Sequence, residues 1–209
     1  MKKFLLINIL LVSGLIHSED LKQKLKTDLD PLMEKVISWR HDIHEFPELG
    51  NREFRTSKKV AEHLSSLGIE IETEIAYTGV VGLIRGAKPG PTIALRADMD
   101  ALPVVEQTGL PFASKERSTF NGLDVGVMHA CGHDVHAAWA AATVYLLSKK
   151  PAKRDVFVIF QPAEEQSKGA KAIMDTGKLS NVAMIFGGHV DRNYAVGEAV
   201  VYDGPIAAN

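Results

Sequence analysis

The amino-acid sequence predicts an α/β fold in which a largely parallel sheet is flanked by helices. From residue 134 onward, helical patterns alternate with short apolar runs that have the length of strands. The run at 156–160, Val-Phe-Val-Ile-Phe, is apolar without a break. Such a run is typical of a strand covered on both faces, as the strands of parallel sheets are.

The expected elements follow one another without an internal repeat. Helices are expected at 30–46, 54–67, 135–147 and 168–174, and strands at 69–75, 80–85, 92–97, 156–160, 183–186 and 195–202. Asp30 followed by Pro31 is the pattern of a helix start, and Asp134 is expected to cap the third helix. Gly68 suits the position just after a helix end. Residues 69–75 alternate apolar and acidic side chains, which indicates a half-exposed strand.

The composition is that of a globular protein. The 209 residues are 45% hydrophobic and 24% charged, which excludes a disordered, collagen-like or multi-span membrane chain. With 24 basic against 26 acidic residues, the net charge of −2 leaves no surplus to neutralise a phosphate backbone, so no nucleic acid partner is expected. Cys131 is the single cysteine, which excludes an intramolecular disulfide.

The first 18 residues are expected to form a signal peptide. Lys2 and Lys3 precede a mostly apolar run at 4–16, and Ser18 offers a small residue at the expected cleavage point. The run is shorter than the roughly 20 apolar residues that a membrane-spanning helix needs, so no stable membrane span is expected. We therefore expect a secreted or periplasmic protein in which residues 19–209 form the fold.

Polar side chains with metal or acid–base chemistry follow the predicted strands. Asp98 and Asp100 come after one strand, Glu164 and Glu165 after the next buried strand, and His189 after the one that follows. Open α/β sheets place their sites beyond the carboxyl ends of the strands. We therefore expect these side chains to converge although they are distant in sequence.

A cysteine–histidine segment is expected at the same place. Cys131 and His133 are two residues apart, and thiolate plus imidazole is a donor set suited to zinc and similar metals. Their neighbours have simpler interpretations: Asp134 as a helix cap, His136 pointing outward from the first helical turn, and His129 hydrogen-bonded within the loop. The other histidines of the predicted fold are interpreted as surface or packing residues: His41, His44 and His63.

The four carboxylates that follow the predicted strands can have different functions. Glu164 and Glu165 are adjacent in an irregular turn, so one can bind metal while the other holds the proton of a metal-bound water; which does which stays open. Asp98 and Asp100 share a face if the segment is extended. A metal ligand, a partner that fixes a histidine tautomer, and a cap of the next loop are all possible uses of these two residues.

Six segments stand in a recognisable order: His44-Glu-Phe-Pro-Glu-Leu-Gly50, Thr78-Gly-Val-Val-Gly82, Ala94-Leu-Arg-Ala-Asp-Met-Asp-Ala-Leu-Pro-Val104, Met128-His-Ala-Cys-Gly-His-Asp134, Phe160-Gln-Pro-Ala-Glu-Glu165 and Phe186-Gly-Gly-His189. Together they resemble the amidohydrolase family of hippurate hydrolases, N-acyl-amino-acid amidohydrolases (aminoacylases) and plant auxin-conjugate hydrolases. The resemblance implies a zinc-peptidase-like catalytic domain with two divalent metal ions, Zn, Mn or similar. It implies cleavage of the amide bond of N-acyl amino acids or small peptide-like conjugates.

The resemblance also implies roles for single residues. The implied metal ligands are Cys131, His133, Glu165 and His189. The Cys131 thiolate is a candidate bridge between the metals, Glu164 looks like the general base, and Asp100 looks like a carboxylate behind the ligands. The role of Asp98 stays open.

The resemblance covers the N-terminal half of such enzymes. Family members continue with a small lid or dimerisation domain and then complete the catalytic domain, including one more histidine ligand, whereas this sequence ends at Asn209. A homodimer is therefore implied only for a full-length form. The alternative to a metal-dependent hydrolase is a catalytically inactive, extracytoplasmic metal-binding remnant. A hydrolase that uses Cys131 as nucleophile is a third possibility.

Overall fold

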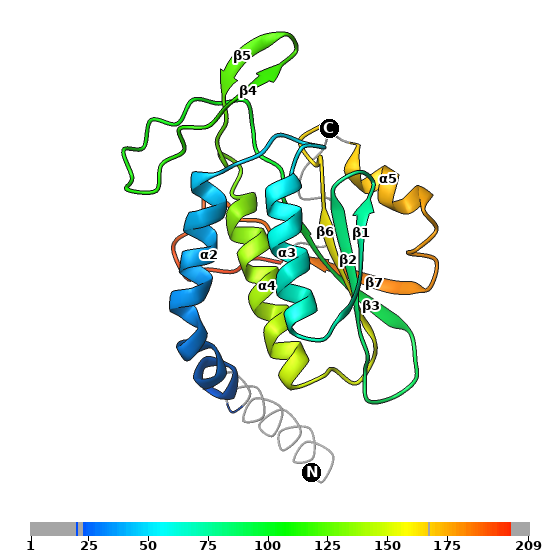
Figure 1. Ribbon diagram of the computed structural model, residues 1–209. Coiled ribbons are helices and arrows are strands. Elements are labelled where there is room, and N and C mark those ends of the chain that lie inside the picture. Colours follow the sequence, from blue (N-terminus) through cyan, green and yellow to red (C-terminus); the bar gives the residue numbers. More distant parts are fainter. Residues whose placement is uncertain (1–19, 21–22, 167, 202–209) are drawn as a thin grey trace, which may run out of the picture.

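The computed structural model describes residues 20, 23–166 and 168–201 and contains a five-stranded sheet with helices against both faces (Figure 1). The helices are η1 (Asp30–Leu32, a 3-10 turn), α2 (Met33–Glu45), α3 (Phe54–Ser66), α4 (His133–Lys149) and α5 (Gly169–Asp175). The strands are β1 (Glu70–Ile75), β2 (Gly79–Ile84), β3 (Thr92–Asp98), β4 (Arg117–Phe120), β5 (Leu123–Gly126), β6 (Val156–Gln161) and β7 (Val182–Gly187).

The sheet has the order β1-β2-β6-β3-β7, and the half formed by β6, β3 and β7 is parallel. The apolar run at 183–186, interpreted as a buried strand, forms the edge strand β7 and is mostly exposed. Strand β3 pairs in parallel with both β6 and β7, while β2 runs antiparallel to its neighbours β1 and β6. The α/β prediction is therefore confirmed, with β2 as the reversed strand of a mixed sheet. The parallel strands β6, β3 and β7 bring their carboxyl ends to one edge, where polar residues follow each of them.

Strand β6 explains the unbroken apolar run in the sequence, because it is covered on both faces. Val158 and Phe160 pack in the main core under α3 and α4, together with Leu64 and Val144. Ile159 points to the other face, in a smaller cluster with Ile173 of α5 and Ala94 of β3. Leu32 of η1 and Val36 of α2 pack on Ala138 and Ala142 of α4, while Ile43 of α2 reaches the main core.

Both predicted helix caps are wrong. Residues 23–29 are already helical, so the chain does not start a helix at Asp30, and the Asp30 carboxylate pairs with the exposed Lys26. Helix α4 has Gly132 at its N-cap, in the left-handed conformation, and no side chain caps it. Asp134 is buried and bonded to other side chains, which makes it unavailable to the helix end.

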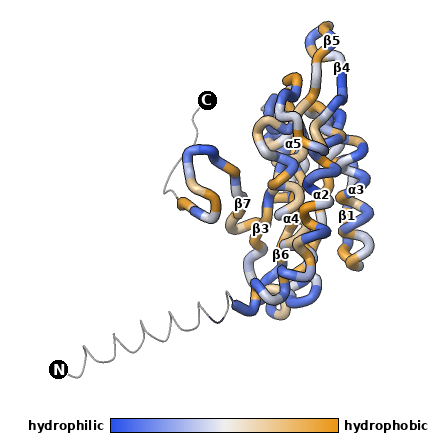
Figure 2. The backbone as a smooth tube through the Cα atoms, turned by 90° about the vertical axis from the view of Figure 1, so that its left-hand side faces the viewer, coloured by the Kyte–Doolittle hydropathy of each residue, from blue (hydrophilic) through white to orange (hydrophobic). Residues whose placement is uncertain are grey.

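The last predicted strand is also wrong over its described part. Residues 195–201 form turns and irregular structure. Glu198 folds back on Ala195 through a backbone hydrogen bond, and Gly197 between them has a positive φ of 88°. Figure 2 shows β7 and this segment at one side of the layered body, where β7 is the edge strand of the sheet.

A hairpin that the sequence analysis did not predict rises above the carboxyl edge of the sheet (Figure 1). Strands β4 and β5 are joined by Asn121 and Gly122, which both have a positive φ, 49° and 81°. Two consecutive residues of this kind form the tight turn that matches the twist of a hairpin, and Asn-Gly is its strongest sequence signal. This dipeptide is the sequence signal from which the hairpin could have been predicted.

The expected signal peptide at 1–18 lies outside the described residues. Among the helices that the structure describes, none combines the length and the apolar character needed to cross a bilayer.

Candidate metal centre

The carboxyl edge of the sheet gathers the residues singled out by the sequence. Asp98 ends β3, His133 begins α4, Glu164 and Glu165 follow β6, and His189 follows β7. Three groups of side chains have donor atoms within 4.8 Å of one another: Cys131 with His133 and His189; Asp98 with His133 and His136; His133 with Glu164 and Glu165. His133 belongs to all three groups, so the predicted convergence is present and is centred on this histidine.

His133 is fully buried and presents one ring nitrogen to the cluster. Its Nδ1 donates to the backbone carbonyl of Asp100 over 2.8 Å, which leaves the lone pair of Nε2 free. That Nε2 has no hydrogen-bond partner and lies 3.8 Å from Oε1 of Glu165 and 3.9 Å from Oε2 of Glu164. Histidines that bind metals are held in this way, by donating from their other nitrogen to a carbonyl or carboxylate.

His189 shows the same arrangement on the opposite side of the cluster. Its Nδ1 donates to the carbonyl of Val190 over 2.7 Å, so Nε2 is again the nitrogen with a free lone pair. This Nε2 lies 3.4 Å from Sγ of Cys131. A nitrogen and a sulfur donor are thus side by side, and His189 is exposed where Cys131 is half-buried.

His136 is buried, and the prediction that it points outward is wrong. Its Nδ1 donates to Oδ1 of Asp98 over 2.7 Å, and its Nε2 accepts a hydrogen bond from the backbone N–H of Val190 over 3.0 Å. Both ring nitrogens are therefore in use within the protein. His136 ties the end of β3 to the segment that carries His189, which makes the group of Asp98, His133 and His136 the least suited of the three to hold a metal.

Asp100 is buried and holds the backbone of the turn at Glu164 and Glu165, called the glutamate turn below. Its Oδ1 accepts from the N–H of Glu164 and its Oδ2 from the N–H of Glu165, each over 3.0 Å. Asp100 Oδ1 also lies 3.3 Å from Nδ1 of His133. One carboxylate thus orients two neighbouring glutamates and a histidine.

Burial and charge set the proton affinities of the cluster. Burial together with the negative charge of Glu165 raises the pKa of Cys131 to about 12. Burial also tends to raise the pKa of Asp98, but the hydrogen bond from His136 and the charges of His133 and Arg96 outweigh it and hold that pKa at about 2. Burial raises the pKa of Glu165. A bound cation would oppose both pKa increases, because its positive charge favours the ionised thiolate and carboxylate.

The unpaired atoms test whether a metal ion fits these residues. Oε1 of Glu165 and Nε2 of His133 are both buried without a hydrogen-bond partner, and they face each other across 3.8 Å. Buried polar atoms are nearly always satisfied, and these two have lone pairs directed at the same region. Thiolate, imidazole and carboxylate together form a donor set for Zn²⁺ and related divalent ions. These residues therefore fit a divalent metal ion.

A second buried network lies next to the cluster and is not apparent from the sequence. Asp134 accepts from Nε of Arg40 over 2.8 Å and from Nδ1 of His44 over 2.9 Å. Nε2 of His44 lies 3.2 Å from Oε1 of Glu106, so both nitrogens of His44 face carboxylates. The hydrogen bond to Asp134 raises the pKa of His44. This network joins α2, α4 and the loop after β3.

His129 stands beside that network without taking part in it. Its ring is buried, neither ring nitrogen has a hydrogen-bond partner, and burial lowers its pKa to about 4. The prediction that His129 hydrogen-bonds the loop is therefore wrong.

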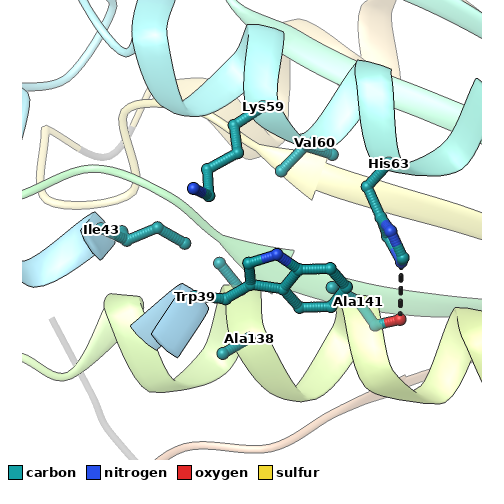
Figure 3. A pocket seen from close by; sticks show the side chains of 8 residues that line it. Trp39, Ile43, Lys59, Val60, His63, Ala138 and Ala141 are labelled. Carbon is teal, nitrogen blue, oxygen red and sulfur yellow. Dashed lines mark hydrogen bonds between the residues drawn. The ribbon is translucent and has the colours of Figure 1, made fainter. Parts of the chain in front are cut away.

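A separate small cavity lies between α2, α3 and α4. Figure 3 shows Trp39 lying across it and His63 bonded to the carbonyl of Ala141. The cavity measures about 20 Å³ and is lined mainly by apolar groups. It is too small to bind a substrate.

Comparison with known proteins identifies the family to which the chain belongs. The model of Peptidase family M20/M25/M40 matches residues 94–203, which include the cysteine–histidine segment, the glutamate turn and His189. This chain belongs to that family. The match confirms the metallopeptidase family that the sequence resembled, although it does not single out hippurate hydrolases within it.

Several relatives are similar over most of the chain. Thermostable carboxypeptidase 1 of Saccharolobus solfataricus is 46% identical over 90% of this chain and 47% of its own length. N-acetylcysteine deacetylase of Bacillus subtilis is 45% identical over 84% of this chain and 45% of its own length. A solved Bacillus subtilis structure, described as a dinuclear metal binding peptidase from the M20 family, is 44% identical with a TM-score of 0.75, over 82% of this chain and 47% of that one. The chain spans about half the length of these relatives.

Proposed function

We propose that this chain supplies the metal-binding part of a hydrolase that cleaves the amide bond of N-acyl amino acids or small peptides. One observation carries the proposal: His133 Nε2 and Glu165 Oε1 are buried and unpaired at 3.8 Å, next to the close pair of Cys131 and His189. The names of the relatives, a carboxypeptidase and an N-acetylcysteine deacetylase, support cleavage of an amide bond with release of a free amino acid. The dinuclear structural neighbour supports two metal ions.

The proposed ligands are the four that the sequence suggested: Cys131, His133, Glu165 and His189. When bound, divalent ions such as Zn²⁺ or Mn²⁺ would polarise the amide carbonyl and lower the pKa of a water molecule. His133 and His189 each offer Nε2 because their Nδ1 atoms donate to backbone carbonyls. Asp100 supports the site without facing it, since its oxygens are engaged by the backbone of the glutamate turn.

Glu164 and Glu165 differ in exposure, which supports different roles for them. The side chain of Glu165 is 20% exposed and has a buried, unpaired oxygen, as suits a ligand. The side chain of Glu164 is 42% exposed and reaches within 3.9 Å of His133 Nε2 from the open side. A carboxylate at the rim can take a proton from water and pass it to a leaving amine, so Glu164 is the proposed general base.

Replacement of Glu164 by Gln tests the proposal in the protein as its own cell makes it. We expect the release of free amino acid from N-acetyl amino acids to fall about 10²–10⁴-fold, because general-base catalysis contributes that much. Metal content, measured by elemental analysis, should be unchanged. Glu62→Gln, an exposed glutamate on α3, is the matched control and should keep full activity. Activity retained in Glu164→Gln would contradict the assigned base.

The same assay distinguishes the alternative function. Wild-type protein that binds metal but releases no amino acid from any N-acyl substrate would support a metal-binding module without catalysis. If full alkylation of Cys131 abolishes activity and added metal does not prevent this loss, the result would support a cysteine nucleophile instead.

A secreted or periplasmic location is part of the proposal. It is supported by the two lysines and the apolar run at 4–16. The intact mass of the protein from its own cell measures whether the first 18 residues are removed.

A further inference from the structure

A further glutamate, Glu53, is completely buried and does not belong to the candidate metal groups. It stands at the start of α3, and one of its oxygens accepts from the hydroxyl of Thr78 on the turn before β2. The other oxygen accepts from the backbone N–H of Ala163 over 2.8 Å. Ionised side chains are costly to bury, and burial raises the pKa of Glu53. A carboxyl group buried where an apolar residue could pack indicates that its hydrogen bonds have a specific role.

Ala163 is the residue just before the glutamate turn, and its backbone is strained. Its φ is 49°, the left-handed region that residues other than glycine rarely adopt. The residue is fully buried, and its carbonyl accepts from the N–H groups of Lys168 and Gly169. Strained conformations persist where the surroundings fix them, and here Glu53 fixes the N–H while the start of α5 fixes the carbonyl.

Glu53 and Asp100 together hold three consecutive backbone N–H groups. Ala163 donates to Glu53, and Glu164 and Glu165 donate to Asp100. The two carboxylates come from different parts of the chain. The backbone of Gly50 also lies close to this turn, since a Cβ at Gly50 would lie 3.0 Å from Cα of Ala163.

We infer that Glu53 is a positioning residue, which holds Ala163 in its left-handed conformation and thereby directs Glu165 to the metals and Glu164 to the rim. This inference rests on the proposed function. Without Glu53, the N–H of Ala163 is buried and unpaired, and the turn relaxes toward an ordinary conformation that rotates the two glutamates out of place.

Zn²⁺ affinity, measured by competition with a chelator, tests the inference in the full protein. Glu53→Ala and Glu53→Asp should weaken Zn²⁺ binding about 10–100-fold, the usual effect of removing a group that orients a ligand. Glu53→Gln should retain affinity close to the wild type, because its amide oxygen still accepts from Ala163 while its NH₂ group donates to the Thr78 hydroxyl. With Co²⁺ in place of Zn²⁺, the visible absorption of the first two variants should change, and that of Glu53→Gln should not.

Glu48→Ala is the matched control. Glu48 lies in the same segment and accepts from the N–H groups of Arg55 and Thr56 at the start of α3, without a contact to the glutamate turn. It should lower the free energy of unfolding and leave Zn²⁺ affinity unchanged, which separates positioning from general stability. If Glu53→Ala does not fold, Glu53→Asp carries the test.

Three outcomes overturn the inference. Unchanged Zn²⁺ affinity in Glu53→Ala and Glu53→Asp would show that Glu53 does not direct the ligands. An equal loss of affinity in Glu48→Ala would show that any destabilisation of α3 has the same effect. A wild-type protein that binds no Zn²⁺ would overturn the proposed function, and this inference with it.

Discussion

His136 donates a hydrogen bond from Nδ1 to the carboxylate of Asp98 over 2.7 Å, across 38 positions of sequence. The bond fixes the tautomer of the ring, so that Nε2 can accept from the backbone N–H of Val190. A histidine that lies among the proposed metal ligands thus positions the neighbour of His189. Proximity to the cluster does not by itself identify a ligand.

Replacement of His136 by Ala should weaken metal binding without removing a ligand. The backbone of Val190 loses its anchor, His189 is held less well, and Zn²⁺ affinity should fall about 10–100-fold. Chelator competition measures the change. His63→Gln is the control, since His63 is also a buried histidine bonded to one backbone carbonyl but lies on α3, away from the cluster. Equal affinity in His136→Ala and the wild type would contradict this role.

Replacement of Asp134 by Asn should destabilise the metal-free protein by about 3 kcal/mol, because it leaves buried charge without its partner. Asp134 pairs with Arg40 and His44, and the Asp134 side chain is 1% exposed. Urea unfolding followed by circular dichroism measures the effect. The exposed pair of Lys171 and Asp175 provides the control, and Asp175→Asn should change stability by less than about 1 kcal/mol. A similar effect of both substitutions would argue against a structural role of the buried network.

The stability of the fold should depend on the protonation of His63. Burial lowers the pKa of His63 below its usual 6.5, so the folded protein keeps the ring neutral while the unfolded chain takes up a proton. The stabilisation is therefore fully present above about pH 6.5 and is lost as the pH falls through and below that value. His63 should contribute a drop in the free energy of unfolding between pH 7.5 and pH 5.5, opposite in sign to the contribution of His44, so any overall drop should be smaller in His63→Gln than in the wild type. An identical drop in both proteins would rule out His63 as a source of the pH dependence.

Binding of metal should release a proton from Cys131. The pKa of about 12 keeps the thiol protonated at neutral pH in the metal-free protein, whereas only the thiolate binds metal. Proton release on addition of Zn²⁺, followed in weakly buffered solution with a pH indicator, should be lower by about one proton per molecule in Cys131→Ala. Alkylation of the metal-free wild type by iodoacetamide should be slow at pH 8. Rapid alkylation would mean that the thiol is already ionised.

The sequence predicted the buried strand β6 and the meeting point of the parallel strands, because apolar runs and the polar residues after them follow from general rules of parallel sheets; the apolar run of β7 did not predict its exposed position at the sheet edge. Val158 and Phe160 gave the strand, and the position of Glu164 and Glu165 after it gave the edge of the sheet. Hydrogen bonds between distant side chains have no such local pattern. The bonds of Asp134 to Arg40 and His44 therefore replaced the local capping role that its position before a helical pattern favoured.

Local patterns also failed where the tertiary context was missing. The segment predicted as the last strand, 195–202, is rich in apolar residues, but Gly197 and the turn from Ala195 to Glu198 prevent a strand over the described residues. The opposite error concerns the hairpin, where the Asn121-Gly122 turn was visible in the sequence and its flanking strands are short and partly polar. Turn chemistry was the stronger signal in both places.

Asp100 holds Glu164 and Glu165 by their main-chain N–H groups and not by their side chains. The path of this turn is therefore independent of which side chains it displays. A change of Glu164 or Glu165 alters the chemistry at the edge of the sheet while the backbone keeps its course. A scaffold of this kind can exchange its reactive groups one at a time, and new specificities can arise on it without a new fold.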